Sequence, residues 1–377
     1  MMKKQWMTMA LMFCLLACRK PYNPPVITAT NGYLVVEGVI NPGTDSTIIR
    51  LSQTVNISSK LSISPVLGAI VSVVSDQNTS WQLKEAGNGN YVSPGLNLDI
   101  THKYGLMIKT ASGKQYQSDL EQAVVTPPID SIGYKITTTP DTGVQVYINA
   151  HDPGNTIKYY RWEYSENWEF HSRFVSYYVS DGNGLVPRGS EDEVSSCFSG
   201  DVSSDIVLGS TAKLSQAILY QSPLAFISSK SEKLETRYRI AVRQYALTSG
   251  AFNFWTNLKK NTEQLGSIFD AQPSQTPGNI HCINNPAEAV VGFVGVCTVA
   301  AKVQEIDESH LPAWVATYPY TCTNDTAKGG TLQDVIHYPD IYVATDFDRR
   351  SGYYLYTTRE CGDCTIRGSR TPPPFWK

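Results

Sequence analysis

The chain of 377 residues is long enough for two or three domains that each close a hydrophobic core, and we expect two. It contains 22 Tyr, 11 Phe and 7 Trp but only 17% charged residues, a composition that favours strands over long helices and predicts a mainly β fold. The formal net charge of -3 argues against a nucleic-acid partner, because no summed positive field is available to attract phosphates.

Residues 1–17 have the pattern of a secretion signal. Lys3 and Lys4 precede an apolar run, residues 6–17, that is too short to cross a bilayer as a helix. The run ends in Leu15-Leu16-Ala17-Cys18, which resembles the lipobox of bacterial lipoproteins. This resemblance implies lipid attachment at Cys18, and several acyl chains anchor a protein stably in a bilayer. The alternative is an ordinary signal peptide followed by a chance cysteine.

Residues 18–31 are expected to form the lipidated N-terminus and a tether. Tyr22-Asn23-Pro24-Pro25 predicts an extended segment, because proline disfavours helix in the residue before it. Arg19 and Lys20 follow the cysteine with no Asp at the next position, so retention in an inner membrane is not indicated. We expect a lipid-anchored protein of the outer membrane, exposed at the cell surface.

Residues 32–126 predict a first β-sandwich. Short segments with alternating apolar residues, such as 33–40 and 103–109, are separated by turn sequences such as Asn41-Pro42-Gly43. The segment also contains Gly89-Asn90-Tyr91, residues 104–108, Gly113 and Tyr116. In this order they resemble the end of a carboxypeptidase-regulatory-like or immunoglobulin-like β-sandwich.

Residues 127–377 predict a second, fibronectin-like β domain, which begins after the boundary Thr126-Pro127-Pro128. Val144, Val146 and Ile148 alternate with polar neighbours, as in strands with one buried face. The arginines at 237, 239 and 243 alternate with apolar residues, which favours a solvated strand face that discourages edge pairing; an anion site is the alternative.

A single helix is expected at 249–265, with long loops around it. Ser249 is the expected cap, Phe252, Trp255 and Leu258 recur at helical spacing, and Gly266 is a suitable end. This apolar stripe indicates a helix that covers a sheet. Elsewhere, residues 185–190 match a thrombin cleavage sequence used in engineered proteins, either by natural coincidence or as an engineered insertion, and their position indicates an exposed loop.

Six cysteines remain after Cys14 in the removed segment and the lipidated Cys18 are set aside. An even number in an exported chain favours disulfides. Fifteen pairings are possible, and we expect Cys322 to pair with one member of the Cys361-Gly-Asp-Cys364 motif. A redox or zinc motif is the alternative for that spacing. The disulfide candidates, which should stabilise the C-terminal region, are Cys197, Cys282, Cys297, Cys322, Cys361 and Cys364.

We expect no catalytic residues, metal site or cofactor. The six histidines are scattered, and Asp152-Pro153-Gly154-Asn155 is a turn without the regular ligands of a calcium loop. Ser210-Thr211-Ala212-Lys213 matches a bare Ser-x-x-Lys pattern without its companion motifs. Glu163, Glu166 and Glu169 imitate the carboxylates of a sugar cleft, but alternation along a strand places Glu166 opposite the other two.

Several motifs further along the chain resemble one family. They are residues 243–248, 254–263, 266–270, 272–274 and 278–280, followed by Cys361-Gly-Asp-Cys364, Arg367-Gly368 and Pro374-Phe375-Trp376. Together they look like the signature of domain-of-unknown-function family 4249, which comprises outer-membrane lipoproteins of Bacteroidota. Family members are commonly encoded beside TonB-dependent transporters, so the resemblance implies an accessory role beside such a barrel. It carries over no catalytic residue.

The leading hypothesis is therefore a non-catalytic accessory or binding subunit of a TonB-dependent β-barrel transporter. A self-standing adhesin or envelope scaffold is the second hypothesis. A glycan-active hydrolase that uses Glu163 or Glu169 is the third.

Overall fold

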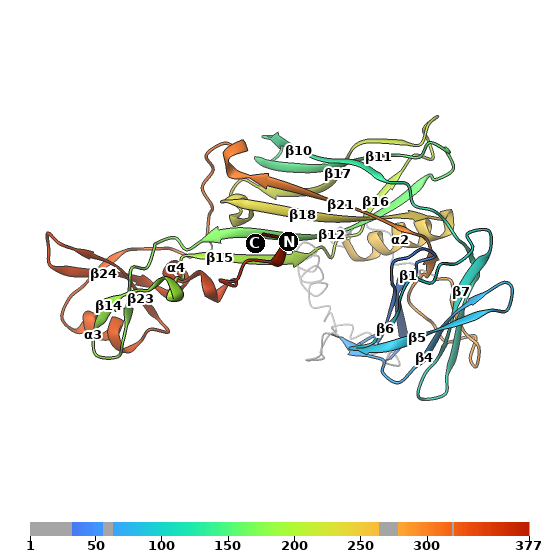
Figure 1. The fold of residues 1–377 in the computed structure, drawn as a ribbon, viewed down its shortest axis with the longest axis horizontal. Helices are drawn as coiled ribbons and strands as arrows, with labels where there is room; N and C mark the ends of the chain where they lie inside the picture. The colour runs from blue at the N-terminus through green and yellow to red at the C-terminus, as the bar shows by residue number, and fades with distance from the viewer. Residues whose placement is uncertain (1–31, 56–62, 264–277, 319, 377) are drawn as a thin grey trace, which may run out of the picture.

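The computed structural model describes residues 32–55, 63–263, 278–318 and 320–376. The expected signal peptide, the lipid site Cys18 and the tether to residue 31 lie outside these residues. The described chain is mainly β, as predicted, and forms three bodies. An N-terminal sandwich lies below one end of a central sandwich, and a C-terminal lobe extends from the opposite end (Figure 1).

The N-terminal sandwich is one continuous sheet that folds over a single core. Its strand order is β19-β8-β7-β4-β5-β6-β2-β1-β20, with β3 beside β2 and β9 beside β7. Alternate residues such as Val36, Leu51 and Val73 point inward and are almost fully buried. The strands are β1 (Leu34–Ile40), β2 (Thr47–Gln53), β3 (Ser64–Pro65), β4 (Ile70–Ser75), β5 (Ser80–Gly87), β6 (Asn90–Ser93), β7 (Lys103–Lys109), β8 (Gln115–Ser118), β9 (Glu121–Gln122), β19 (Ile280–Cys282) and β20 (Gly295–Val296).

Two strands of this sandwich come from beyond the expected boundary at residue 126. β19 pairs antiparallel with β8, and β20 pairs parallel with β1, so residues 278–298 return to the first body. Thr126 fixes the crossing point, because its N–H donates to Thr298 Oγ1 over 2.9 Å. Segments of two or three residues show no periodicity. The sequence analysis therefore placed β19 in a loop after the helix and β20 in the second domain.

The central sandwich consists of two facing sheets that share the largest core. The sheet β10-β11-β17 covers the sheet β15-β12-β18-β21, to which β16 is added beside β12. In β12 every second residue from Tyr160 to Phe170 is buried, which confirms the predicted alternation. The strands are β10 (Ile129–Thr137), β11 (Gly143–His151), β12 (Tyr159–His171), β15 (Ser196–Val202), β16 (Val207–Ser210), β17 (Ile218–Ser228), β18 (Arg237–Leu247) and β21 (Val299–Asp307).

The arginine face of β18 was expected to be solvated; Arg243 is exposed as expected, but Arg237 and Arg239 are partly covered. β18 lies between β12 and β21, and the C-terminal 3-10 helix η6 (Pro374–Trp376) covers part of this face. The Arg239 guanidinium lies 3.9 Å from the ring centre of Phe375, and that of Arg237 lies 4.6 Å from that of Trp376. Planar guanidinium groups stack well on aromatic rings, so these arginines hold the end of the chain.

Helix α2 (Ser249–Glu263) fills the seam between the two sandwiches. Its Ala251 and Phe254 are buried against Phe293 and Cys297. The expected cap was Ser249, but the Thr248 hydroxyl accepts the Ala251 N–H over 3.3 Å, so Thr248 is the capping residue. The last two predicted helical residues and Gly266 lie outside the described residues.

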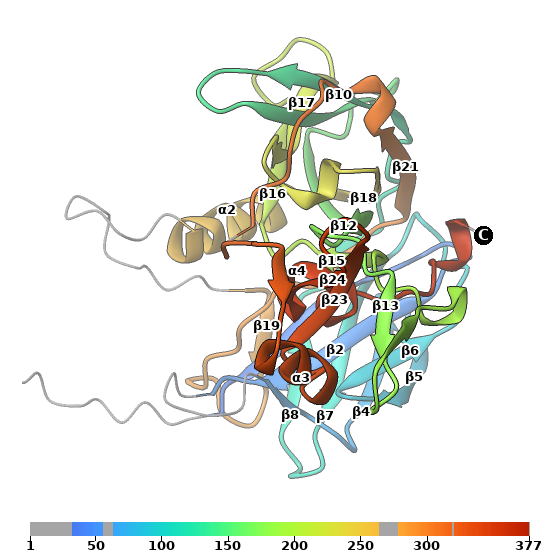
Figure 2. The ribbon, with the colours of Figure 1, turned by 90° about the vertical axis from the view of Figure 1, so that its left-hand side faces the viewer.

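The C-terminal lobe combines short strands with two helices that the sequence did not predict (Figure 2). The hairpin β13-β14 lies beside the sheet β22-β24-β23. Helix α3 contains Thr331, Val335 and Ile336, and β-branched residues lower helix propensity. The elements are β13 (Tyr178–Ser180), β14 (Leu185–Pro187), β22 (Asp325–Ala327), α3 (Gly330–His337), β23 (Tyr342–Asp348), β24 (Tyr353–Thr358) and α4 (Arg359–Gly362).

Four further 3-10 helices connect these elements: η2 (Ser190–Asp192), η3 (Glu232–Leu234), η4 (Glu308–His310) and η5 (Cys364–Ile366). Within the described ranges, none of the helices has the length and apolar character needed to span a bilayer.

Candidate functional site

The glutamates of β12 lie on opposite faces of the strand, as the alternation predicts. Glu166 points into the core of the central sandwich and is buried. Its carboxylate accepts the Tyr238 hydroxyl over 2.6 Å and pairs with Lys233 Nζ at 2.5 Å. Burial, reinforced by the charge of Glu166, raises the pKa of Tyr238 far above its usual value, so this tyrosine stays protonated.

Glu163 and Glu169 are also engaged, on the other face. Glu163 pairs with Arg161 at 2.8 Å and accepts the Tyr245 hydroxyl over 2.7 Å. Glu169 pairs with Arg237 at 3.3 Å. The nearby Trp162 and Trp168 are 1% and 7% exposed, so their rings cannot stack on a sugar. The two glutamates link β12 to the neighbouring strand β18 through an ion pair and a hydrogen bond, and they do not line an open cleft.

The other sequence patterns lie in ordinary turns. Ser210 ends β16 and its hydroxyl accepts the Ala212 N–H over 3.2 Å, while Lys213 is exposed. Asp152 accepts the backbone N–H groups of Thr156 and Ile157, which confirms a turn. Among the described residues, no group of three or more His, Cys, Asp or Glu side chains is placed to hold a metal ion.

Four of the six candidate cysteines form disulfides. Cys322 is bonded to Cys361, as predicted, and Cys197 is bonded to Cys364. The first bond joins helix α4 to the segment before β22, and the second joins η5 to β15. The first bond crosslinks the C-terminal lobe internally, and the second fastens it to the central sandwich.

The candidates Cys282 and Cys297 are free thiols, which corrects the expectation for these two. Cys282 faces the core of the N-terminal sandwich, and Cys297 packs in the seam beside helix α2. Both behave as small apolar residues. Burial raises the pKa of the Cys297 thiol to about 12, so it is protonated and unreactive at neutral pH.

A cavity of about 210 Å³ lies inside the lobe, between the hairpin β13-β14, strand β23 and helix α4. We call it the lobe cavity. Its walls are mainly apolar and aromatic, and four charged side chains interrupt them. The residues that line it are Tyr178, Val179, Ser180, Leu185, Arg188, Val194, Val335, Pro339, Asp340, Tyr342, Val343, Ala344, Arg359 and Asp363.

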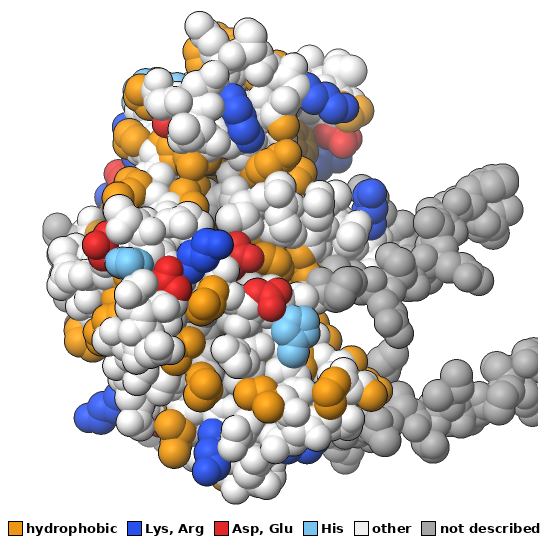
Figure 3. All heavy atoms as spheres, turned by 90° about the vertical axis from the view of Figure 1, so that its right-hand side faces the viewer, with side chains coloured by type: hydrophobic (Ala, Val, Ile, Leu, Met, Phe, Trp, Pro, Cys, Tyr) orange, Lys and Arg blue, Asp and Glu red, His pale blue; other side chains and the backbone are white. Residues whose placement is uncertain are grey.

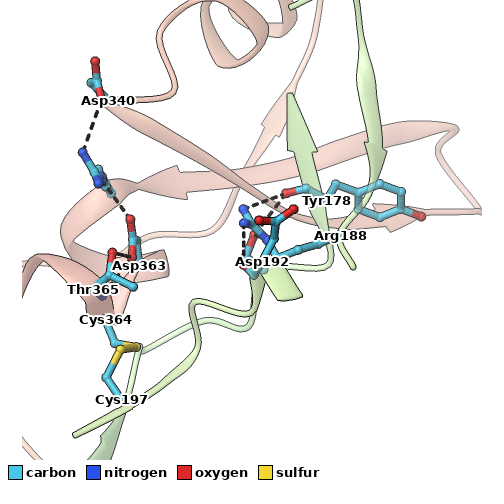
Figure 4. A network of polar contacts seen from close by, with 10 residues as sticks. Tyr178, Arg188, Asp192, Cys197, Asp340, Asp363, Cys364 and Thr365 are labelled. Atoms are coloured by element: carbon cyan, nitrogen blue, oxygen red, sulfur yellow. Dashed lines mark hydrogen bonds and ion pairs between the residues drawn. A yellow bond between two sulfur atoms is a disulfide. The ribbon is translucent and has the colours of Figure 1, made fainter. Parts of the chain in front are cut away.

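Three of the four charged side chains form one cluster, in which Arg359 pairs with two carboxylates. Arg359 Nε lies 2.9 Å from Asp363 Oδ2, and Arg359 Nη1 lies 3.3 Å from Asp340 Oδ1. The second oxygen of Asp363 accepts the Thr365 N–H over 2.9 Å (Figure 4). Thr365 follows Cys364 directly, so the disulfide that ends here also fixes the carboxylate of Asp363.

Arg188, the fourth charged residue, bonds only neutral oxygens. Its Nε donates to Ser176 Oγ (3.1 Å), Nη1 to the Asp192 carbonyl (2.9 Å) and Nη2 to the Tyr178 carbonyl (3.2 Å) (Figure 4). Burial lowers the pKa of Arg188, against the charges of Asp363, Asp192 and Glu193. The segment 185–190 is exposed at Val186, Pro187 and Ser190, as the sequence indicated, but residues 185–187 form strand β14 instead of a loop.

Sequence reasoning missed Arg188, Arg359 and Asp363 as a group. Arg188 directly follows β14 and is far along the chain from Arg359 and Asp363, which begin and follow α4, and these short elements leave no periodic pattern. The only signal was the cysteine motif, which marks the segment that carries Arg359 and Asp363.

A broader hollow of about 420 Å³ lies over the sheet β10-β11-β17, where Lys135, Gln145, Pro223 and Phe226 contribute to its lining. On the face drawn in Figure 3, apolar side chains are scattered and interrupted by charged ones rather than gathered in one patch. The lobe cavity is the smaller of these two hollows, and it is lined by residues from the hairpin β13-β14, β23 and helices α3 and α4.

The fold and the cavity define a class: a disulfide-stabilised β protein of several bodies, with a partly polar cavity at one end. The model of the family described as "Domain of unknown function (DUF4249)" matches residues 19–303. The chain belongs to this family.

No curated protein matches the chain. Among solved structures, chitinase ChiA74 from Bacillus thuringiensis is 13% identical, with a TM-score of 0.17. The match covers 52% of this chain and 28% of the chitinase chain. At this TM-score the likeness carries no structural or functional argument.

Proposed function

We propose that the protein is a lipid-anchored lipoprotein of the outer membrane that serves as a non-catalytic binding subunit beside a TonB-dependent barrel. Three observations support this. The sequence carries a segment ending in Cys18 that resembles a lipobox. The two disulfides fit an oxidising, extracytoplasmic compartment. The chain belongs to a family whose members, by the resemblance described above, are encoded beside such transporters.

The observation that carries the non-catalytic part is the state of the three glutamates in β12. A general acid and base must reach a substrate and exchange protons with it. Here each carboxylate is held by a cation or a tyrosine hydroxyl within the sheet. The lobe cavity is instead enclosed by elements that two disulfides fix, an arrangement suited to recognition.

The test is affinity purification of the tagged chain from native outer membranes. We expect a TonB-dependent barrel to be recovered with the wild type, and mass spectrometry to find acylated Cys18 at the mature N-terminus. Cys18→Ser should abolish both results. Cys14→Ser is the matched control, because that cysteine precedes the cleavage point and should leave both unchanged.

Two results would overturn the proposal. One is a mature N-terminus other than acylated Cys18. The other is purification of the acylated protein without any barrel, and self-association of that material would favour the adhesin or scaffold hypothesis.

A further inference from the structure

We propose that the lobe cavity binds a carboxylate ligand with an apolar body of about amino-acid size, and that Arg188 is the group that recognises it. This inference rests on the proposed binding function and names the ligand class. The ligand could be a free amino or keto acid, or the C-terminal residue of a peptide, because these share the same chemistry.

The first step is the charge of Arg188. Partly buried cations in proteins are normally paired with an anion, because desolvation penalises an isolated charge. Of the six other partly buried arginines in the described residues, five form ion pairs with carboxylates and Arg50 does not; the five are Arg161, Arg237, Arg239, Arg359 and Arg367. Arg188 makes no ion pair within the part of the chain that the structure describes.

The second step is the hydrogen-bonding capacity that Arg188 retains. A guanidinium group has five N–H donors, two on each terminal nitrogen. Nη1 and Nη2 each make one hydrogen bond, to the carbonyls of Asp192 and Tyr178. One N–H therefore remains on each terminal nitrogen, and a carboxylate accepts such a pair through its two oxygens.

The third step is the state of the neighbouring acids. Asp363 is neutralised by Arg359 and by two hydrogen bonds from Thr365. Asp340 pairs with the same arginine, and its side chain is 94% exposed. A ligand anion in the cavity would thus meet Arg188, which makes no direct ion pair, and two carboxylates that share the single positive charge of Arg359.

The fourth step is the size and lining of the cavity. Its volume of about 210 Å³ is below the usual range of drug-sized sites, roughly 300–1,000 Å³. Val335, Tyr342 and Val343 supply apolar wall, which suits an aliphatic or aromatic side chain. A bare inorganic anion would leave this wall uncovered, so a carboxylate attached to an apolar group fits the lining better.

The experiment is calorimetric titration of the full-length, detergent-solubilised lipoprotein. The probes are N-acetyl-leucine, its neutral analogue N-acetyl-leucinamide, free leucine, and a tetrapeptide ending in leucine with a free or an amidated C-terminus. We expect each carboxylate form to bind at least about tenfold more tightly than its amide, the ratio expected for one charge-assisted pair. Preference for the tetrapeptide over the single residues would identify the source as peptide C-termini.

Arg188→Gln should weaken the binding of N-acetyl-leucine at least about tenfold, and Arg188→Lys should restore part of it. Arg349→Gln is the matched control, because Arg349 is exposed in the same lobe. Near-ultraviolet circular dichroism will show whether Arg188→Gln retains the native lobe. If it does not, Val194→Phe narrows the cavity and keeps the Arg188 side chain, and it should abolish binding.

Equal affinity for acid and amide, no binding to the folded wild type, or full binding by Val194→Phe would each overturn the inference. Failure of the accessory role is distinguishable from this. A protein that binds carboxylates but recovers no barrel would retain the ligand class and lose the proposed partner.

Discussion

The central sandwich and the C-terminal lobe stabilise themselves by different means. Strands of seven to thirteen residues, such as β12 and β18, support one another by long ladders and bury large aromatic residues between the sheets. The lobe has strands of three to seven residues around a small core, and it depends on two disulfides. Extended pairing makes a rigid frame, whereas the crosslinked lobe can enclose a cavity without a large core of its own.

Removing the disulfides should have the largest effect, because it should destabilise the C-terminal lobe and spare the central sandwich. Cys197→Ser with Cys364→Ser should lower the unfolding free energy of the lobe by about 4–5 kcal/mol, because the bond closes a loop across a separation of 167 residues. Cys322→Ser with Cys361→Ser spans 39 residues and should cost about 3–4 kcal/mol. Hydrogen exchange should accelerate in β22, β23 and β24 while β12 and β18 keep their protection. Equal acceleration of hydrogen exchange in the lobe and in the central sandwich would contradict the idea that only the lobe depends on the disulfides.

The second prediction concerns the buried pair of the central sandwich. Glu166→Gln keeps an acceptor for Tyr238 but leaves Lys233 without its anion. The unfolding free energy should fall by about 2–3 kcal/mol, somewhat less than for a fully buried pair because Lys233 is partly exposed. Denaturant titration measures the loss, and the double variant with Lys233→Met should recover much of it. A loss below about 0.5 kcal/mol in Glu166→Gln would mean that the pair is not structural.

The third prediction is a loss of stability in alkali. Burial raises the pKa of Tyr160 to about 12 and raises those of Tyr238 and Tyr245 above their usual value of 10. Above pH 10 the unfolded chain releases these protons and the folded chain keeps them, so stability falls as pH rises. The slope is about 1.4 kcal/mol per pH unit for each tyrosine. Tyr238→Phe should reduce the measured slope by about 1.4 kcal/mol per pH unit. An unchanged slope would mean that Tyr238 does not contribute to the loss of stability in alkali.

The smallest effect is expected at the partly exposed carboxylates. Glu163→Gln with Glu169→Gln removes two ion pairs that solvent screens, so each should contribute less than about 1 kcal/mol. Ligand affinity at the lobe cavity should not change, which calorimetry can check. Loss of a glycan-cleaving activity in this variant would instead revive the hydrolase hypothesis.

Long periodic patterns made the frame predictable from sequence. The alternation in β12 placed Glu166 opposite Glu163 and Glu169, and the stripe of Phe252, Trp255 and Leu258 located helix α2. The cysteine motif indicated that Cys322 would bond to one of its members. Each of these features is local, or repeats over many residues, so the physical signal accumulates along the chain.

The candidate site could not be predicted in the same way. Arg188, Arg359 and Asp363 meet because a hairpin and a helical turn are brought together by tertiary contacts and a disulfide. Strands β19 and β20 were not assigned to the N-terminal sandwich for a related reason, because segments of two or three residues show no period. The partly covered arginine face of β18 also depends on tertiary contacts, because β21 pairs with this strand and Phe375 and Trp376 stack on its arginines.

The position of β19 and β20 has a consequence for how the protein matures. They cap the two ends of the sheet path in the N-terminal sandwich, against β8 and β1. During synthesis, the N-terminal sandwich therefore remains open at both edges until the chain has passed helix α2. Open strand edges invite mispairing, so this body is most prone to misfolding while the stretch between β9 and β19 is being made.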